Sequence, residues 1–475
     1  MATLELSSGT LQQETFDKVG DGFHYSEIEL LKDNKYTANY PYKLNSGTTI
    51  TGPEDTSAVI TLSPGLSRTL FPSMTPIFGQ AGSTISDILV ENITFKGNRL
   101  AQAAAGIPHG QGFDNFVGLK NGKNITIRNI IAGESQGDIA RLTDCENILY
   151  CGNLIKEAGH EGLYADRCSG VEAWNNTTYC RTNSALRSKG SKGVSFHDNL
   201  VFGTTEAYSP GIQVENSEED ETTSEISIYN NTIQNTLGPG VWAAGLRATA
   251  INAAKNLLVR NNLIINCGLM PAGNGIPGVG GMVVDGWDNV TIKDNTINGC
   301  LGYGILFGRY QTTSSSSGYS ATVKNNIITN TKKNLVGTQG LAIANQGRYI
   351  LDISDNCFYG NVSNGLTGSA PVLKDPLFVN GYHLSAMGGH YTESGYVLDS
   401  VNSPCIYSGG EAGRYNGTNE ASRYCIIEED ESSGGAVGEP EPPEEPVKII
   451  VTCSSQDVLD ISKSLTEEYS IYKKV

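Results

Sequence analysis

The sequence predicts an all-β solenoid, in which the chain winds through many short parallel strands. A repeat carries this prediction: a short alternating strand, then Asn-Asn or Asp-Asn, then a second apolar strand, as in GVEAWNNTTY, GVSFHDNLVF, EISIYNNTIQ, NLLVRNNLII and NVTIKDNTIN. A second motif, Gly-apolar-x-apolar, precedes the copies, as in GLYAD, GIQVE, GVWAA and GMVVD. Self-similarity of this kind is typical of repeat architectures.

The Asn of the repeat sets the length of one coil. Successive copies lie 23 to 33 residues apart, so we take 23 residues as one coil and the excess as loop. A strand this short cannot bury a face alone, so coils must stack to close a core. We expect the repeated side chains to stack about 4.8 Å apart and to satisfy one another's amides. They are Asn98, Asn129, Asn153, Asn176, Asn199, Asn231, Asn262, Asn295, Asn326 and Asn356.

Composition excludes several classes of protein. The chain has 475 residues, of which 56 are Gly and only 17% are charged, and its net charge is −17. An acidic chain binds polyanions poorly, which argues against nucleic acid or an anionic membrane as a partner. The low charge density argues against coiled coils and disorder. No apolar run approaches the ~18 residues of a membrane span.

The N-terminus and the cysteines predict synthesis in a reducing compartment. The start, MATLELSSGTLQQETFDKVGDG, has no basic or apolar segment, so we expect no secretory signal. The ten cysteines are scattered singly, with no CxxC and no Cys/His cluster, which predicts no zinc site. We interpret them as reduced core residues.

Four regions are predicted along the chain. Residues 1–44 are expected to form an N-terminal cap, and residues 45–427 the solenoid. Residues 428–447 contain EEDESSGGAVGEPEPPEEP, whose Gly, Pro and like charges predict an extended linker. Residues 448–475 are expected to form a strand and an amphipathic helix that docks on the solenoid, on a copy of itself in a homo-trimer, or on a larger assembly.

Residues 45–425 resemble right-handed parallel β-helix proteins of the pectate-lyase-like superfamily. The segment LNSGTTITGPEDTSAVITL is similar to a first coil, and DPLFVNGYHLS with SPCIYSGG and AGRYNGT is similar to the closing pattern. The resemblance implies a single-stranded right-handed parallel β-helix. It also implies one of several activities, since the superfamily includes polysaccharide lyases, glycoside hydrolases, uronate epimerases, tailspikes and adhesins.

In such a solenoid the outward side chains of adjacent coils form columns. Alignment of the coils predicts a first column of Gly118, Arg141, Tyr164, Arg187, Gln213, Trp242, Val283, Leu306 and Ala342. The second column is Lys120, Thr143, Asp166, Lys189, Glu215, Ala244, Asp285, Gly308 and Ala344. Polar and aromatic residues gather on the middle coils, which predicts a groove there.

Asp166, Lys189 and Glu215 are the candidate catalytic residues. On three successive coils the two carboxylates would lie about 9–10 Å apart, near the separation in an inverting glycosidase. Lys189 between them would stay protonated. The alternative is a charge ladder that avoids like-charge stacking.

The stretch LRSKGSK also resembles the segment that carries the base lysine in β-helix alginate and chondroitin lyases, with Lys189 at the matching position. The next coil, GIQVEN, departs from that family because it has Gln213 and Glu215 where the lyases have an arginine.

The remaining candidates are substrate-binding residues. Arg141 and Arg187 could neutralise a uronate carboxylate. Tyr164, between these arginines, and Trp242 are candidate sugar-stacking platforms, or else ordinary packed aromatics. His160 could shuttle protons or be a structural turn residue. No organic cofactor motif is present, although the acidic loop from Glu215 to Glu225 could take up Ca²⁺ or simply be solvated.

Two functions follow, both with a carbohydrate ligand. One is a virion tail spike or surface adhesin that can also process glycans, placed on the virion or the extracellular surface after synthesis in the cytoplasm. It rests on the absent signal, the free cysteines and the segment 448–475. The other is a polysaccharide-degrading enzyme, a uronate lyase, epimerase or glycoside hydrolase, acting in the groove on the middle coils.

Overall fold

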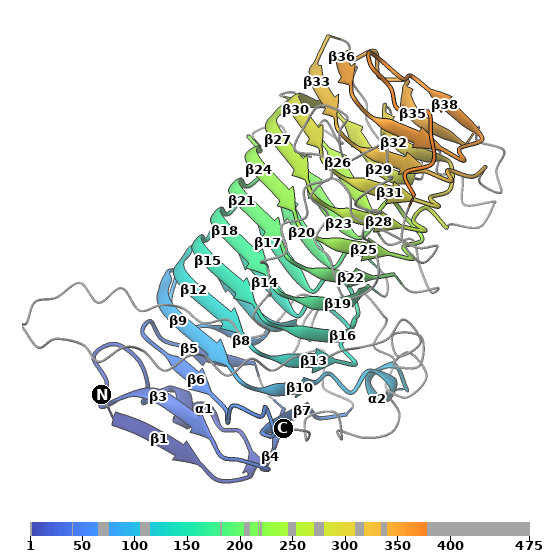
Figure 1. Ribbon diagram of the computed structural model, residues 1–475. Helices are drawn as coiled ribbons and strands as arrows, with labels where there is room; N and C mark the ends of the chain where they lie inside the picture. The colour runs from blue at the N-terminus through green and yellow to red at the C-terminus, as the bar shows by residue number, and fades with distance from the viewer. Residues whose placement is uncertain are drawn as a thin grey trace, which may run out of the picture.

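The computed structural model describes residues 2–39, 41–64, 76–104, 115–180, 183–203, 210–216, 218, 221–245, 253–269, 280–308, 318–333 and 340–377. In this part of the chain three parallel sheets run the length of a stack of coils (Figure 1). Sheets A and B have 13 described strands each, and sheet C has 12. Each coil passes through sheet A, sheet B and sheet C in turn, which confirms the predicted parallel β-solenoid.

Sheet A contains, in chain order, β1 (Ala2–Leu6), β3 (Tyr25–Leu30), β6 (Thr49–Thr51), β9 (Ile85–Glu91), β12 (Gly122–Arg128), β15 (Glu146–Cys151), β18 (Ser169–Trp174), β21 (Lys192–His197), β24 (Ser224–Tyr229), β27 (Ala254–Arg260), β30 (Trp287–Lys293), β33 (Ser320–Lys324) and β36 (Ile350–Ser354).

Sheet B contains β2 (Gly9–Thr10), β4 (Lys35–Ala38), β7 (Val59–Leu62), β10 (Thr94–Lys96), β13 (Ile131–Gly133), β16 (Leu154–Ala158), β19 (Thr177–Cys180), β22 (Leu200–Phe202), β25 (Thr232–Gln234), β28 (Leu263–Ile265), β31 (Thr296–Asn298), β34 (Ile327–Thr329) and β37 (Cys357–Tyr359).

Sheet C contains β5 (Tyr42–Leu44), β8 (Pro76–Gln80), β11 (Asn115–Lys120), β14 (Ala140–Thr143), β17 (Leu163–Asp166), β20 (Leu186–Lys189), β23 (Ile212–Glu215), β26 (Val241–Ala244), β29 (Gly280–Asp285), β32 (Tyr303–Phe307), β35 (Leu341–Asn345) and β38 (Ser363–Gly365).

Residues 2–44, assigned to a cap by the sequence, supply strands β1 to β5 of the same three sheets. The piece that covers an open edge is α1 (Gln13–Phe16), next to β5 at the N-terminal end of sheet C. The Gln13 amide donates to the Lys43 carbonyl at 3.1 Å, and the Lys43 N–H donates back to Gln13 Oε1 at 2.9 Å. These bonds occupy backbone groups that an edge strand would otherwise leave open.

The other helix is α2 (Arg99–Ala104). Neither α1 nor α2 is long enough to cross a membrane, and the described residues contain no other helix. The predicted solenoid end at 427, the linker 428–447 and the segment 448–475 lie outside the described residues.

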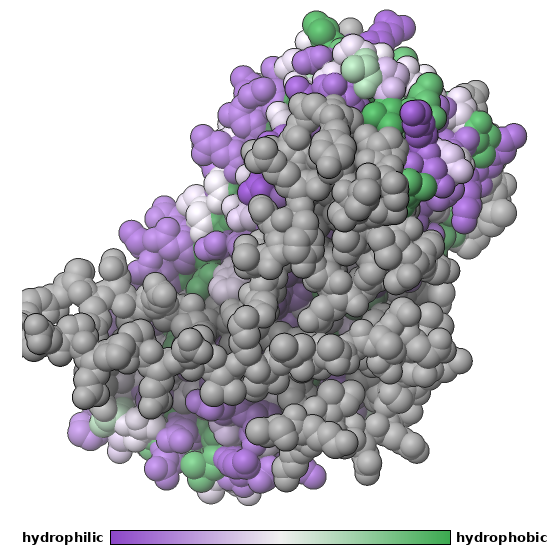
Figure 2. Space-filling model, viewed as in Figure 1, coloured by the Kyte–Doolittle hydropathy of each residue, from purple (hydrophilic) through white to green (hydrophobic). Residues whose placement is uncertain are grey.

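Period-2 alternation fills the interior. Along sheet A the inward side chains form a continuous apolar column of Ile125, Ile148, Val171, Val194, Ile226, Leu257 and Val290, each paired in register with the next. All are buried. The outward positions of these strands are largely polar, and Figure 2 shows hydrophilic residues along the left-hand edge of the stack, where Figure 1 places sheet A. Burial of this column accounts for the strictly repeated pattern.

The predicted asparagine ladder exists at the turn from sheet A to sheet B. Eight buried side chains form a chain in which each Nδ2 donates to the Oδ1 of the next at 2.9–3.0 Å: Asn153, Asn176, Asn199, Asn231, Asn262, Asn295, Asn326 and Asn356. From Asn176 on, each Oδ1 also accepts the backbone N–H of the preceding Asn, so it satisfies two donors.

The prediction was wrong for Asn98 and Asn129. Ile93 and Ile130 hold the ladder position of those coils, and the ladder starts where the Ile130 N–H donates to Asn153 Oδ1. Asn129 instead has φ of 52° and occupies the turn position that comes one residue before the ladder position. In the next two coils the left-handed residues Gly152 and Asn175 occupy this turn position. Asn and Gly tolerate that conformation best.

The cysteine prediction holds in part. Cys145, Cys168, Cys267, Cys300 and Cys357 are free and buried, as expected for core residues. Cys151 is disulfide-bonded, which contradicts the prediction that all cysteines are reduced. The side chains of Cys180, Cys405, Cys425 and Cys453 lie outside the described residues.

An aromatic column lies on the outward face of sheet A. His197 stacks between Trp174 and Tyr229, with ring centroids 6.1 and 4.6 Å away and ring planes within 4° of parallel. Its two ring nitrogens face different carboxylates: Nδ1 lies 2.7 Å from Asp198, and Nε2 lies 3.1 Å from Glu172. Burial opposes protonation, but these two carboxylates raise the pKa of His197 above its usual value.

A pH dependence of stability follows. The pKa of His197 in the folded state lies above its value of about 6.5 in the unfolded state. Protonation of His197 therefore stabilises the fold fully below about pH 6.5, and this stabilisation is lost as the pH rises through the folded-state pKa. We therefore expect the H197Q variant to be destabilised most at pH 5–6 and less at pH 9, measured as denaturant midpoints of both proteins. A destabilisation that stays constant across this range would show that only the ring stacking matters.

Candidate functional site

The first outward column of sheet C is present as predicted over eight strands. Its members pair in register in the order Gly118, Arg141, Tyr164, Arg187, Gln213, Trp242, Val283 and Leu306. The prediction was wrong at the last position, because Leu306 pairs with Ala344 and not with Ala342. The polar members Arg141, Tyr164, Arg187 and Gln213 lie on the four successive strands β14, β17, β20 and β23.

The second column places Asp166, Lys189 and Glu215 on three successive strands, as predicted. Their side chains do not form the predicted alternating ladder. The Asp166 carboxylate pairs with Arg167 at 3.2 Å, and the Glu215 carboxylate binds Arg187. The three candidate catalytic residues thus take part in separate ion pairs.

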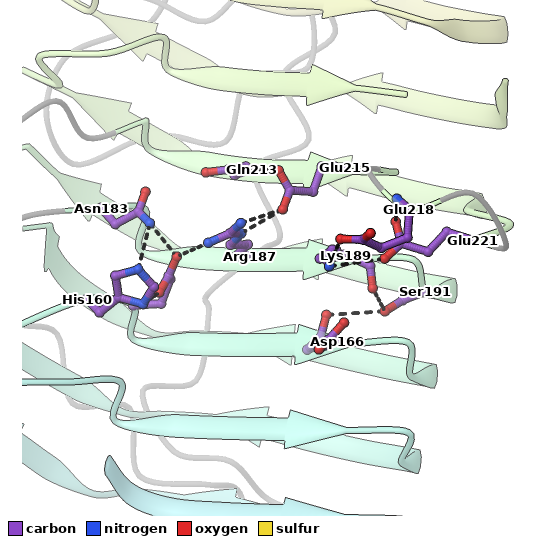
Figure 3. Close-up of polar contacts among 12 residues, drawn as sticks. His160, Asp166, Asn183, Arg187, Lys189, Ser191, Gln213, Glu215, Glu218 and Glu221 are labelled. Atoms are coloured by element: carbon purple, nitrogen blue, oxygen red, sulfur yellow. Dashed lines mark hydrogen bonds and ion pairs between the residues drawn. The ribbon is translucent and has the colours of Figure 1, made fainter. Parts of the chain in front are cut away.

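Lys189 pairs with the acidic loop that follows β23. Its Nζ lies 3.0 Å from Glu218 and 3.3 Å from Glu221 (Figure 3). Burial opposes protonation, but these carboxylates raise the pKa of Lys189. The ammonium group lies between two carboxylates of the acidic loop, for which the sequence left Ca²⁺ uptake and simple solvation as alternatives. A lysine held in this way is a poor general base.

The guanidinium group of Arg187 donates hydrogen bonds to two protein carboxylates, those of Glu161 and Glu215. Its Nη1 donates to Glu161 at 2.9 Å, while Nε and Nη2 both donate to Glu215 Oε1. Gln213 donates to the other Glu215 oxygen at 2.9 Å. The predicted role of Arg187 as a bidentate ligand for a uronate is therefore not available in this arrangement, because its guanidinium is already engaged.

The two predicted stacking platforms are buried. Tyr164 is 5% exposed. The guanidinium carbons of Arg141 and Arg187, on the two strands that flank β17, lie 4.4 and 4.5 Å from the centre of its ring. Trp242 is 3% exposed and packs in a small apolar cluster with Val283, Tyr303 and Leu306. Neither ring offers a face to a sugar, which leaves the packed-aromatic alternative.

His160 is the most exposed of the predicted residues near Arg187, with 26% of its side chain accessible. Its Nδ1 lies 2.8 Å from Asp138 Oδ1 and contacts Glu161 Oε2. Its Nε2 lies 3.2 Å from the Asn183 amide nitrogen, which donates to Glu161 Oε1 at 2.7 Å. Both carboxylates have no exposed surface.

The five side chains Asp138, His160, Glu161, Arg187 and Glu215 are hereafter the ionic cluster. Figure 3 shows His160, Asn183, Arg187 and Glu215 in a row across successive strands, with Lys189 and its glutamates farther along the strand direction. Burial opposes charge on His160, yet Glu161 and Asp138 raise its pKa to about 10. Burial raises the pKa of Glu161. Asp138 is buried as well, but the positive charge of His160 lowers the pKa of Asp138.

Sequence reasoning missed Asp138, Glu161 and Asn183. The 23-residue coil was the signal that could have found them, because Asp138 and Glu161 are one such step apart and so are His160 and Asn183. The step places each pair at equivalent turns before sheet C. There the Asn115 side chain accepts the Asp138 N–H at 2.8 Å, and the Asp138 side chain accepts the Glu161 N–H at 2.9 Å.

Asp138, His160 and Glu161 are also the residues that could hold a metal ion. One ligand atom from each lies within 4.8 Å of the other two. The sequence predicted no zinc site, because its cysteines and histidines form no cluster, and Ca²⁺ was considered only at the acidic loop from Glu215 to Glu225.

Comparison with protein families gives two matches, each covering less than half of the chain. Residues 115–276 match a model described as a right handed beta helix region. Residues 223–409 match a model described as disaggregatase related. A comparison with curated proteins finds no match.

Solved structures with the same fold are similar at low sequence identity. The A-module of the mannuronan C-5 epimerase AlgE6 from Azotobacter vinelandii is 18% identical, with a TM-score of 0.57 over 78% of this chain and 97% of that one. The surface protein and adhesin PfbA of Streptococcus pneumoniae is 14% identical, with a TM-score of 0.41 over 76% of this chain and 96% of that one. The chain is a right-handed parallel β-helix protein, as its sequence predicted.

Proposed function

We propose that this protein binds a polysaccharide across the outward face of sheet C, on the coils of β14, β17, β20 and β23, and acts on it at the ionic cluster. The observation that carries the proposal is the concentration of buried ionisable side chains at this one place. Only 17% of the chain is charged, yet Asp138, Glu161 and Glu215 are each at most 1% exposed. Removing a charge from water costs several kcal/mol, so such clusters mark functional sites more often than structural ones.

The fold does not require charge in the column that holds Arg187. Farther along the same column Trp242, Val283 and Leu306 are apolar and equally buried, and the sheet continues through them in register. Arg187 therefore differs from the later members of its column for a reason other than solenoid stability.

A linear polymer suits this face. Outward side chains of successive coils lie about 4.8 Å apart along sheet C, so a polymer lying along the stack meets several of them at once. The partly exposed members, Arg141, His160 and Lys189, supply hydrogen-bond donors for sugar hydroxyls. The mannuronan epimerase module has the same fold, and that likeness supports carbohydrate as the ligand class.

The test is turnover on a panel of acidic and neutral polysaccharides, read by absorbance at 235 nm and by release of reducing ends. Absorbance indicates β-elimination of a uronate, and reducing ends alone indicate hydrolysis. We expect one of these signals from the native protein and a fall of about 100-fold or more in kcat/KM for E161Q, because Glu161 positions both His160 and Arg187.

The matched control is E91Q, which alters an ion pair of the same type on sheet A, where Glu91 lies 2.6 Å from Arg128. This variant should keep full activity. Equal losses in both variants would contradict the assignment of the site, and silence on every polysaccharide would contradict both β-elimination and hydrolysis.

Binding without turnover would favour the attachment role, a tail spike or adhesin. That finer function also needs a docking element, and the segment predicted to provide it, 448–475, lies outside the described residues. A shift of the native protein in affinity electrophoresis on a polysaccharide that it does not degrade would identify this case.

A further inference from the structure

Three potential metal ligands converge at the turn before sheet C. Asp138 Oδ1 lies 2.8 Å from His160 Nδ1, and Glu161 Oε2 contacts the same nitrogen. The three donor atoms lie within 4.8 Å of one another. Ligands of one ion with bonds of about 2.0–2.2 Å are about 3–3.5 Å apart, so small side-chain rotations would admit an ion.

The remaining atoms of each ligand are held by other side chains. Asp138 Oδ2 accepts from Arg141 at 3.2 Å, and Glu161 Oε1 accepts from Arg187 at 2.9 Å. The Asn183 amide N–H also donates to Glu161 Oε1, at 2.7 Å. Outer partners of this kind orient metal ligands and are a regular part of metal sites.

One ligand atom is buried without a hydrogen bond. Glu161 has no exposed surface, and among the described residues its Oε2 accepts no hydrogen bond of ordinary geometry; its close contact is with His160 Nδ1. A buried carboxylate oxygen in this state carries a large desolvation cost. A cation bound between Glu161, Asp138 and His160 would remove that cost.

The geometry points to a binding site for a divalent first-row transition ion, such as Zn²⁺ or Mn²⁺, formed by Asp138 Oδ1, His160 Nδ1 and Glu161 Oε2. One imidazole nitrogen and two carboxylate oxygens suit these ions, whereas Ca²⁺ prefers six to eight oxygens. Three protein ligands leave coordination positions open, as in catalytic rather than structural sites. The inference goes beyond action on polysaccharides and does not depend on it.

The test is titration of the chelator-treated full chain with Zn²⁺ in a calorimeter, with Mn²⁺ and Ca²⁺ in parallel and Co²⁺ absorption as a spectroscopic probe. We expect about one Zn²⁺ per chain and ligand-field absorption of bound Co²⁺. Loss of an outer partner weakens metal affinity about 10- to 100-fold, so N183A should weaken binding by that factor and H160Q by about 100-fold or more.

His197 provides the matched control. It also has two carboxylate partners, but Glu172 and Asp198 lie at opposite ring nitrogens, so their oxygens cannot share one ion with a single nitrogen. H197Q should bind Zn²⁺ like the native chain. No binding by the native chain, or binding unchanged in both H160Q and N183A, would overturn the assignment. Since the readout is binding, these outcomes are independent of any polysaccharide assay.

Discussion

The N262A variant is expected to lose about 3 kcal/mol or more of its free energy of unfolding. Asn262 lies in the middle of the buried ladder, where its Oδ1 accepts both the backbone and the side-chain N–H of Asn231 at 3.0 and 2.9 Å. Its Nδ2 donates to the Ile228 carbonyl at 2.9 Å and to Asn295. Alanine would leave at least three polar groups buried without these partners, at about 1–3 kcal/mol each. Denaturant unfolding at neutral pH measures the loss.

The N298A variant is the control for this prediction. Asn298 lies on β31, is only partly buried, and accepts from Thr329 and Asn330 at 3.0 and 2.9 Å. Water can replace its bonds, so we expect a loss below about 1 kcal/mol. If N262A lost no more stability than N298A, the ladder would not be the element that holds the coils together at this turn.

The R187M variant is expected to lose about 3–5 kcal/mol, because it leaves two buried carboxylates without their cation. Arg187 binds both Glu161 and Glu215, which are 0% and 1% exposed. Methionine preserves much of the packing volume and removes the charge. We expect the loss to appear as a lower denaturant midpoint in the same experiment.

R128M tests whether burial is the cause. Arg128 has one ion-pair partner, Glu91 at 2.6 Å, on the more exposed outward face of sheet A. Arg128 and Glu91 are 21% and 14% exposed, whereas Glu161 and Glu215 are at most 1% exposed, so this variant should lose less stability than R187M. Similar losses in the two variants would mean that the ionic cluster has no special burial cost.

The fold was predictable because it depends on local, repeated features. The apolar alternation and the Asn turn recur in every coil, and a side chain in a solenoid contacts its equivalents one coil away. The ladder failed at Asn129 because this Asn holds the left-handed turn position, one residue before the buried one, and it failed at Asn98 because that residue lies beyond β10, outside this turn. In sequence the two positions look alike, and only the stacking of Ile93 and Ile130 distinguishes them.

The columns of sheet C were predictable for the same reason, but the side-chain partners were not. Lys189 was expected between Asp166 and Glu215, and it binds Glu218 and Glu221 instead. A long side chain reaches beyond its own column, and loops between coils vary in length without a repeat. The register after Leu306 also failed, because Ile305 pairs with Ile343 and Leu306 with Ala344, two residues beyond the predicted Ala342.

Part of the site was missed because it lies at turns. His160 was predicted at such a turn, but Asp138 and Glu161, which also precede strands of sheet C, were not, because the other candidates came from the strand columns. Ion pairs across two turns depend on how neighbouring coils superpose, and the 23-residue step gives that superposition once the coil is known.

Hydroxyl-radical footprinting, with and without an oligosaccharide of the polysaccharide that the protein binds, tests the central claim most directly. That claim is that the glycan lies on sheet C at the ionic cluster. His160 lies at the turn before sheet C and His197 lies on sheet A, so each histidine reports its own face. We expect the ligand to reduce oxidation of His160 several-fold and to leave His197 and Trp174 unchanged. Protection of His197 and Trp174 with no change at His160 would contradict it and place the glycan on sheet A.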